Sequence, residues 1–223
     1  MHAALHLEDW QAWSAAQASV AINSQHDIST NPGAAKLPAM LRRRLDEVGR
    51  ATCEILKTLD PEASCPLIHA SRHGDATHTL QMLEALAQGD PISPTRFSMS
   101  VHNAVLGVHS IASRHHRPLQ ALGACGHEFD ALVCEARGYL TEGYPAVVIV
   151  FSEGPRPAAY QGHAEYPESP CAVGMRLTLD SGRKLLPHDV SQSARPTPLD
   201  VIAWLNADTP HLDGQQRWQL EER

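Results

Sequence analysis

The apolar run at residues 146–151, AVVIVF, constrains the fold more than any other part of the sequence. It contains no polar position and is rich in β-branched residues, which is typical of a strand buried on both faces of a sheet. A strand of this kind needs helices above and below it. We therefore expect this strand to be central and buried in an α/β fold.

The rest of the chain alternates predicted strands with predicted helices. Short apolar runs predict strands at residues 66–71, 119–122 and 171–179, with a weaker one at 3–7. Apolar residues three and four apart predict helices over 38–59, 77–87, 101–112, 128–139 and 198–206. The composition of residues 27–36 and 93–95 predicts a loop and a turn, and Trp10 and Trp13 are spaced as on one face of a turn. This order predicts an open sheet with helices on both faces.

Length and charge limit the kind of protein that this chain can be. It has 223 residues, enough for one compact domain over residues 1–223 that needs no metal or disulfide for its stability. The formal net charge of -7 gives no support for a nucleic acid or an anionic membrane as the main partner. The basic run Arg42, Arg43 and Arg44 lies within a predicted helix and is typical of a solvated face.

Neither a membrane span nor an exported, disulfide-bonded protein is indicated. No apolar stretch approaches the roughly 20 residues that a spanning helix needs, and the N-terminus lacks the order of a signal peptide. The 5 cysteines are odd in number and have no paired spacing, so neither a disulfide framework nor a zinc site is indicated. We expect free thiols and a cytoplasmic location.

The histidines raise the question of a metal site. The chain has 14, and His69, His73 and His78 crowd one predicted strand end, while His102 and His109 lie seven apart on one predicted helix. The first three straddle a change from strand to loop, and zinc needs further ligands fixed by surrounding groups. Surface or capping histidines are therefore favoured over a metal centre.

A cysteine at a turn between a strand and a helix is the sharper candidate for chemistry. Cys125 follows the predicted strand 119–122 and precedes the helix that begins near Glu128. Free N–H groups at a helix N-terminus stabilise a thiolate and so could activate this thiol. The alternative is a small buried residue without reactivity, and residue type alone favours that alternative.

A set of short motifs carries a resemblance to a known family. They are ASRHG at residues 70–74, SPT at 93–95, Phe97-Ser98, SVHNA at 100–104, Gly107, and SIA at 110–112. With these motifs the chain resembles the β-ketoacyl synthase-like N-terminal domain family, of the chain-length-factor-like type found in aryl polyene pathways. The similarity extends through nearly the whole chain.

The resemblance implies a thiolase-like half fold with a mixed, mostly parallel sheet and helices on both faces. It also implies fatty-acid or polyketide chain elongation on an acyl carrier protein. In complete synthases a second half supplies two histidines for decarboxylation and charge stabilisation, and this sequence ends before that half. We therefore expect a catalytically incomplete subunit without independent activity, in a heterodimer with a complete ketosynthase, where it helps to shape the acyl tunnel. No cofactor is implied.

The resemblance also assigns two kinds of site. Cys125 falls where complete synthases place their acyl-accepting cysteine, although Gly126, His127 and Glu128 depart from the usual small-residue context. An acyl-transfer enzyme with Cys125 as the thioester nucleophile is therefore the alternative. Complete synthases dimerise through the segment that corresponds to residues 101–122, which gives the expected partner interface: Val101, His102, Asn103, Ala104, Gly107, Ser110, Ile111, Leu119 and Leu122.

Overall fold

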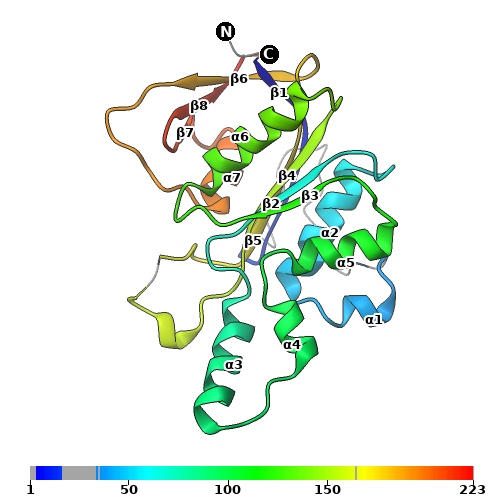
Figure 1. Cartoon of the computed structure of the whole chain (residues 1–223). Coiled ribbons are helices and arrows are strands. Elements are labelled where there is room, and N and C mark those ends of the chain that lie inside the picture. Colours follow the sequence, from blue (N-terminus) through cyan, green and yellow to red (C-terminus); the bar gives the residue numbers. More distant parts are fainter. Residues whose placement is uncertain (1–3, 17–33, 35, 164, 223) are drawn as a thin grey trace.

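A single mixed sheet organises the molecule (Figure 1). The computed structural model describes residues 4–16, 34, 36–163 and 165–222. The 8 strands within these residues run in the order β3-β2-β4-β5-β1-β6-β8-β7. Their bounds are β1 (Leu5–Ser14), β2 (Leu67–Ala70), β3 (Leu119–Leu122), β4 (Val147–Glu153), β5 (Cys171–Thr178), β6 (Arg183–His188), β7 (Leu212–Asp213) and β8 (Arg217–Leu220).

Helices cover both faces of this sheet. α2 packs against β1, β4 and β5 with α5 beside it, whereas α6 packs against β2, β3 and β4, and α7 against β5. The helix bounds are α1 (Ala39–Arg42), α2 (Glu47–Leu59), α3 (Ala76–Gln88), α4 (Pro94–Met99), α5 (Ala104–Ser113), α6 (Glu128–Thr141) and α7 (Pro198–Leu205), with a 3-10 turn η1 (Ala158–Tyr160). The predicted α/β class, the mixed sheet and the helices on both faces are confirmed.

Parallel pairing is confined to one part of the sheet. β2 pairs in parallel with β3 and with β4, whereas the pairs from β4 through β5, β1, β6 and β8 to β7 are antiparallel. The helices between β2 and β3 and between β3 and β4 provide the crossover connections that parallel strands need. The expectation of a mostly parallel sheet therefore holds for β3, β2 and β4 and not for the remaining strands.

The predicted central strand is β4, and the structure confirms its burial. It lies between β2 and β5, and every one of its residues is buried. Val147, Ile149 and Phe151 join the core cluster beneath α6 and α7, whereas Val148 and Val150 join the cluster beneath α2. Successive side chains of a strand point to opposite faces, so an uninterrupted apolar run fills both cores.

The first strand is longer than predicted, and it contains both tryptophans. Trp10 and Trp13 lie within β1 and not on one face of a turn. Trp10 packs beneath α6 and α7 and Trp13 beneath α2. A register shift between Leu7 and Asp9 changes which residues face each side, and this irregularity hides the alternation in the sequence.

Two local predictions about the helices need correction. The helix predicted over 38–59 is divided into α1 and α2, because the Asp46 side chain accepts a hydrogen bond from the Gly49 N–H at 2.7 Å and so begins a new helix. The turn predicted at residues 93–95 is the start of α4, with Pro94 in its first turn.

The other predicted elements appear close to their expected bounds. β2, β3, β5, α3, α5, α6 and α7 are confirmed, whereas β6, β7 and β8 were not predicted. The loop predicted at 27–36 lies outside the described residues except for Ala34 and Lys36. None of the helices in the described ranges is long and apolar enough to cross a membrane.

Candidate functional site at the Cys125 turn and the sheet edge

The turn between β3 and α6 presents the Cys125 thiol to solvent. Cys125 is exposed, and its backbone has a φ of 52°, in the left-handed region that non-glycine residues seldom adopt. Gly126 follows with a φ of 105°, which glycine adopts without strain. The structure therefore does not bury Cys125 as a small core residue. It places the thiol on a tight turn at the start of a helix.

A buried carboxylate already occupies the N-terminus of this helix. Glu128 is fully buried and accepts hydrogen bonds from the backbone N–H groups of Gly126 at 2.9 Å and Ala124 at 3.2 Å. Burial favours the protonated acid, but these N–H groups and the Arg72 guanidinium outweigh it and hold the pKa of Glu128 below its usual range. Glu128 is thus hydrogen-bonded to the N–H groups of the residues on both sides of Cys125. These N–H groups could otherwise donate to a thiolate or an oxyanion.

Arg72 connects this turn to the end of the central strand. Its guanidinium lies 3.4 Å from the Glu128 carboxylate, and its backbone N–H donates to the carboxylate of Glu153 at the end of β4. Burial raises the pKa of Glu153 to about 7, and the other oxygen of this carboxylate is buried without a hydrogen-bond partner among the described residues. Arg72 therefore contacts two buried carboxylates next to the turn, Glu128 through its guanidinium and Glu153 through its backbone N–H.

A buried network of polar side chains lies beside the turn, at the ends of β2 and β4. His69 Nδ1 lies 3.3 Å from the carbonyl oxygen of His102, and His69 Nε2 lies 2.7 Å from the Ser152 hydroxyl. A carbonyl can only accept, so Nδ1 donates to it and the hydroxyl donates to Nε2. Burial lowers the pKa of His69 to about 4, which makes it a weak base. The cavity beside them, of about 50 Å³, has room for water but not for a substrate.

His102 joins this network to the Cys125 turn. A side chain added at Gly74 or Gly123 would lie 3.2 Å or 3.7 Å from the imidazole of His102. The ring therefore packs between two loops, at the carboxyl ends of β2 and β3. The structure gives His102 a role within its own fold, in addition to the interface expected from the sequence.

β3 forms the edge of the sheet beside this turn. Within the described residues it is hydrogen-bonded on one side only, to β2. The carbonyls of Pro118 and Leu122 accept from β2 and the following loop, so the alternating geometry of a strand directs the backbone groups of Leu119 and Ala121 to the open side. An unpaired edge can accept a strand from another chain.

The predicted interface residues of α5 and β3 come together beside this edge. Val101, Asn103, Ile111 and Leu119 are exposed, and Ile111 is 69% exposed. His102, Gly107, Ser110 and Leu122 are half-buried, whereas Ala104 is packed inside the fold. A side chain added at Gly107 would meet no atom within 4 Å, so this helix surface is open to close approach.

Comparison with protein families identifies the chain. The profile of the β-ketoacyl synthase N-terminal domain matches residues 10–218. The chain belongs to this family. No curated protein matches the sequence.

Solved ketosynthase structures share the fold of this β-ketoacyl synthase N-terminal domain. A chain of a ketosynthase (ApeO) in complex with its chain length factor (ApeC) from Xenorhabdus doucetiae is 25% identical, with a TM-score of 0.78, and the match covers 98% of this chain and 99% of that one. A type II PKS acyl-carrier protein complex with its ketosynthase bound to the hexaketide matches at 14% identity and TM-score 0.56, over 93% and 75% of the two chains. A β-ketoacyl synthase from Burkholderia phymatum STM815 matches at 11% and 0.54, over 79% and 57%. These likenesses confirm the expected thiolase-like fold.

The histidines of this ketosynthase-like domain are spread over separate contacts. His73 stacks on Tyr166 with ring centroids 3.9 Å apart, and His78 pairs with Asp75 at the start of α3. His109 is a buried residue of α5, and its Nε2 lies 3.3 Å from the Ser113 hydroxyl. Within the described ranges, no group of three His, Cys, Asp or Glu side chains is placed to hold a metal ion.

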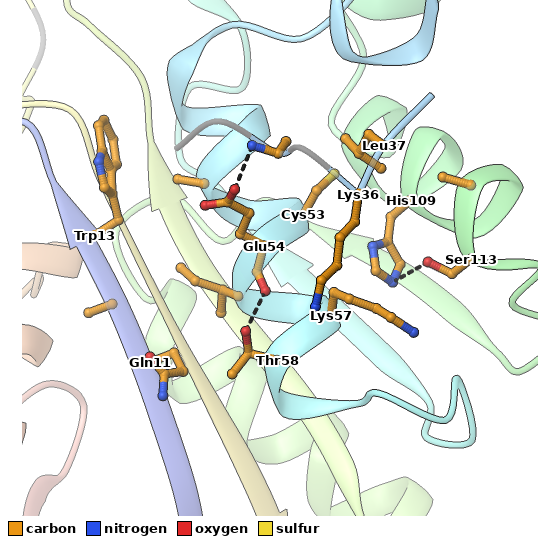
Figure 2. Close-up of a pocket in the computed structure, with 15 residues that line it drawn as sticks. Gln11, Trp13, Lys36, Leu37, Cys53, Glu54, Lys57, Thr58, His109 and Ser113 are labelled. Atoms are coloured by element: carbon orange, nitrogen blue, oxygen red, sulfur yellow. Dashed lines mark hydrogen bonds between the residues drawn. The ribbon is translucent and has the colours of Figure 1, made fainter. Parts of the chain in front are cut away.

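A larger hollow of about 460 Å³ lies between β1, α2 and α5 (Figure 2). Trp13, Ala51 and Ile55 line it with apolar surface, and Glu54, Lys57 and His109 contribute polar groups. Burial lowers the pKa of His109 to about 4, so this histidine is neutral. No residue of the Cys125 turn lines this hollow, so it is separate from the candidate nucleophile.

Sequence reasoning located the turn but missed the residues that support it. Glu128 carries no motif of its own, and its partner Arg72 lies 56 positions earlier in the chain. The run ASRHG, which contributed to the family resemblance, contains this arginine and is the one signal that pointed toward it.

Proposed function

We propose that this protein is a catalytically incomplete, chain-length-factor-like subunit that binds a complete ketosynthase as a cytoplasmic heterodimer. Its fold is one domain over residues 1–223. The heterodimer acts in fatty-acid or polyketide chain elongation of the aryl polyene type, on chains carried by an acyl carrier protein. One observation carries the proposal: apolar side chains on and next to α5 and β3, namely Val101, Ile111 and Leu119, remain exposed beside the open edge of the sheet.

The exposed apolar residues are concentrated in one part of the chain. Of the large hydrophobic side chains exposed in the described ranges, all except Met40 lie between Leu83 and Leu119. Of these residues, Val101, Ile111 and Leu119 lie on or next to α5 and the unpaired β3 edge, whereas Leu83, Leu86 and Phe97 lie on α3 and α4. Contiguous exposed apolar surface on a globular protein usually marks an interface with another protein.

The chemistry of the Cys125 turn supports a subunit that is not itself the catalyst. Condensation requires stabilisation of negative charge on the reacting thioester, and backbone N–H groups at a helix start commonly provide it. Here the Glu128 carboxylate accepts hydrogen bonds from the N–H groups of Ala124 and Gly126, and it places a negative charge beside the thiol. These two N–H groups are therefore not free to stabilise an acyl intermediate on Cys125.

The comparison of lengths is consistent with this role. The Xenorhabdus chain, which belongs to a complex of a ketosynthase with its chain length factor, is matched over 99% of its own length. A chain of this extent therefore occurs within a two-protein ketosynthase assembly. The acyl-carrier complex of the second match supports the same kind of pathway for the partner.

An acyl-transfer enzyme is the second candidate, and one observation favours it. Cys125 is exposed on a turn with a left-handed backbone, and both features suit a nucleophile. Intact-mass measurement after incubation with acyl thioesters distinguishes the two functions. A stoichiometric adduct that Cys125→Ala abolishes would establish the enzyme and exclude the incomplete subunit.

Co-expression with a complete ketosynthase from the same organism tests the leading function. We expect a complex with one copy of each chain by size-exclusion chromatography with light scattering. We also expect that the complex condenses malonyl and acyl thioesters and that this chain alone does not. Turnover by the pure chain, or a stable monomer in the presence of the ketosynthase, contradicts the proposal.

A further inference from the structure

Two helices project from the body of the fold and form what we call the arm, residues 76–99 with α3 and α4. Figure 1 shows the arm extending away from the sheet, beyond the end of β2. Ala76 is the only buried residue of α3, and α4 has none. α3 packs on α4, and α4 packs on α5. The arm therefore contributes little to the core of its own chain.

The arm carries large apolar side chains on its surface. Leu83 is 52% exposed, Leu86 is 55% exposed and Phe97 is 59% exposed. Leu83 and Leu86 are three residues apart on α3 and so lie on one face of the helix. Anchors with this spacing are those that a helix inserts into an apolar groove of another protein.

We propose that the arm is a second docking element, whose apolar ridge of Leu83 and Leu86 on α3, together with the exposed Phe97 on α4, binds a groove on the ketosynthase partner. The inference rests on the proposed function and extends the interface beyond residues 101–122. The arm is continuous with that interface, because α4 leads through the exposed Val101 directly into α5. Both elements therefore meet the same partner.

The size of the interface supports a second element. Residues 101–122 number 22, and five of them are buried within this chain: Ala104, Leu106, Val108, His109 and His115. A specific and stable interface takes about 20–30 residues on each side. The residues of this segment that are not buried fall short of that number, and the arm provides exposed surface next to them.

The composition of the arm indicates how it recognises the partner. Its Asp, Glu, Lys and Arg residues are Glu84, Asp90 and Arg96, which carry both signs of charge. Attraction by a charged surface is therefore weak, and binding depends on burial of apolar side chains. A charge placed on the ridge should consequently weaken the complex much more than a charge elsewhere on the arm.

A pair of double variants tests this inference. Leu83→Asp with Leu86→Asp places two charges on the ridge, and Gln81→Asp with Gln88→Asp places two charges on exposed polar positions of the same helix. The dissociation constant for the purified ketosynthase partner is measured for each double variant. We expect the loss of two apolar anchors in the ridge variant to weaken binding by about 100-fold or more, and the control to stay within about threefold of the native chain.

Hydrogen exchange of the arm amides provides a second measurement. In the native chain, binding of the ketosynthase should slow exchange in residues 76–99 as well as in β3. If the complex forms but the ridge variant binds as tightly as the control and the arm exchanges at its free rate, the inference is wrong and the proposed function stands. If the native chain does not bind the ketosynthase, both are wrong. Loss of self-association in the ridge variant, with ketosynthase binding unchanged, would identify a second copy as the occupant and would also overturn the inference.

Discussion

The Glu128 carboxylate accepts the backbone N–H of Gly126 at 2.9 Å, one residue beyond the Cys125 thiol. In a nucleophilic site, the N–H groups of such a turn stabilise charge on the substrate. Here they stabilise a side chain of the protein itself. The turn that resembles an active site thus has its N–H groups of Ala124 and Gly126 already bonded to Glu128.

This relationship predicts that the Cys125 thiol is dispensable. Cys125→Ala should leave the amount of pathway product unchanged in cells that carry the ketosynthase, because the thiol holds no acyl group in the proposed role. Alanine is also non-glycine at the same left-handed position, so we expect the free energy of unfolding to change by less than about 0.5 kcal/mol. Cys134→Ala, at the other exposed cysteine, is the matched control. Loss of product from a normally assembled Cys125→Ala complex would favour the acyl-transfer function.

Removal of the Glu128 side chain should destabilise the turn strongly. Glu128→Ala leaves Arg72, which is 12% exposed, without its buried partner, and it leaves the N–H groups of Ala124 and Gly126 unpaired. Breaking a buried ion pair from one side costs about 3–5 kcal/mol. Urea unfolding followed by circular dichroism measures the loss, with Glu135→Ala on the same helix as a control that should stay within about 0.5 kcal/mol. Equal losses in the two variants would show that the Glu128 contacts contribute nothing specific.

Glu153 predicts a change of stability with pH. Its pKa is raised from 4.5 to about 7 in the folded chain, so the folded protein holds this proton more tightly than the unfolded one. The resulting stability is fully present below pH 4.5 and is lost as the pH rises through 7. A shift of this size corresponds to about 3 kcal/mol. His69 and His109 have lowered pKa values and act in the opposite direction, because their contribution is lost as the pH falls from 6.5 to about 4.

The variant Glu153→Gln isolates this contribution from that of the histidines. Glutamine imitates the protonated acid at every pH, so the variant should gain stability relative to the native chain as the pH rises from 4.5 to 8. We expect the difference in unfolding free energy to change by roughly 3 kcal/mol over that range. Chemical denaturation of both proteins at several pH values measures it. A difference that stays constant with pH would show that Glu153 ionises normally.

Prediction from sequence succeeded where one segment determines its own structure. The AVVIVF run is sufficient to specify β4, because its side chains fill both cores. The position of the Cys125 turn followed in the same way from the strand before it and the helix after it. β6 was missed because its sequence, RKLLPH, does not alternate cleanly between apolar and polar residues, and β8 because RWQL has only 4 residues, too few to establish a period.

The supporting contacts of the site depend on distant parts of the chain. The roles of Glu128 and Arg72 arise only when β2 and the turn after β3 come together at one end of the sheet. The exposure of the arm could also not be predicted from the sequence. A helical spacing of apolar residues does not reveal whether the apolar face packs within its own chain or against another chain. These properties belong to the tertiary structure and leave no local pattern.

Proline substitutions in β3 should distinguish the contribution of its open side, which we expect to bind the partner, from that of the side that pairs with β2. Ala121 directs its N–H to the open side, so Ala121→Pro removes a donor that this chain does not use in its own sheet, and unfolding should stay close to native. Gln120 directs its N–H toward β2, so Gln120→Pro should destabilise the fold. We expect Ala121→Pro to abolish co-purification with the ketosynthase if a partner strand pairs with the edge. Normal co-purification of a folded Ala121→Pro protein would exclude pairing at this edge.

Two glycines offer a direct comparison between α5 and α6. Gly107 on α5 and Gly138 on α6 are both helical, and a side chain added at either would meet nothing within 4 Å. Arginine is a better helix former than glycine by close to 1 kcal/mol, so neither Gly107→Arg nor Gly138→Arg should destabilise the isolated chain. Thermal unfolding of both variants checks this point first.

Only the change on α5 should disrupt the complex. Gly107 lies within the proposed interface, where a bulky charge at a packed centre should cost several kcal/mol of binding free energy. Gly138 lies on the helix layer of the opposite face, away from α5. Co-purification with the ketosynthase partner should therefore be lost in Gly107→Arg and retained in Gly138→Arg. Because both variants add the same side chain to an open helical position, a loss confined to Gly107→Arg locates the partner on α5. Retention of both complexes would show that α5 faces solvent in the assembly and that the partner binds elsewhere.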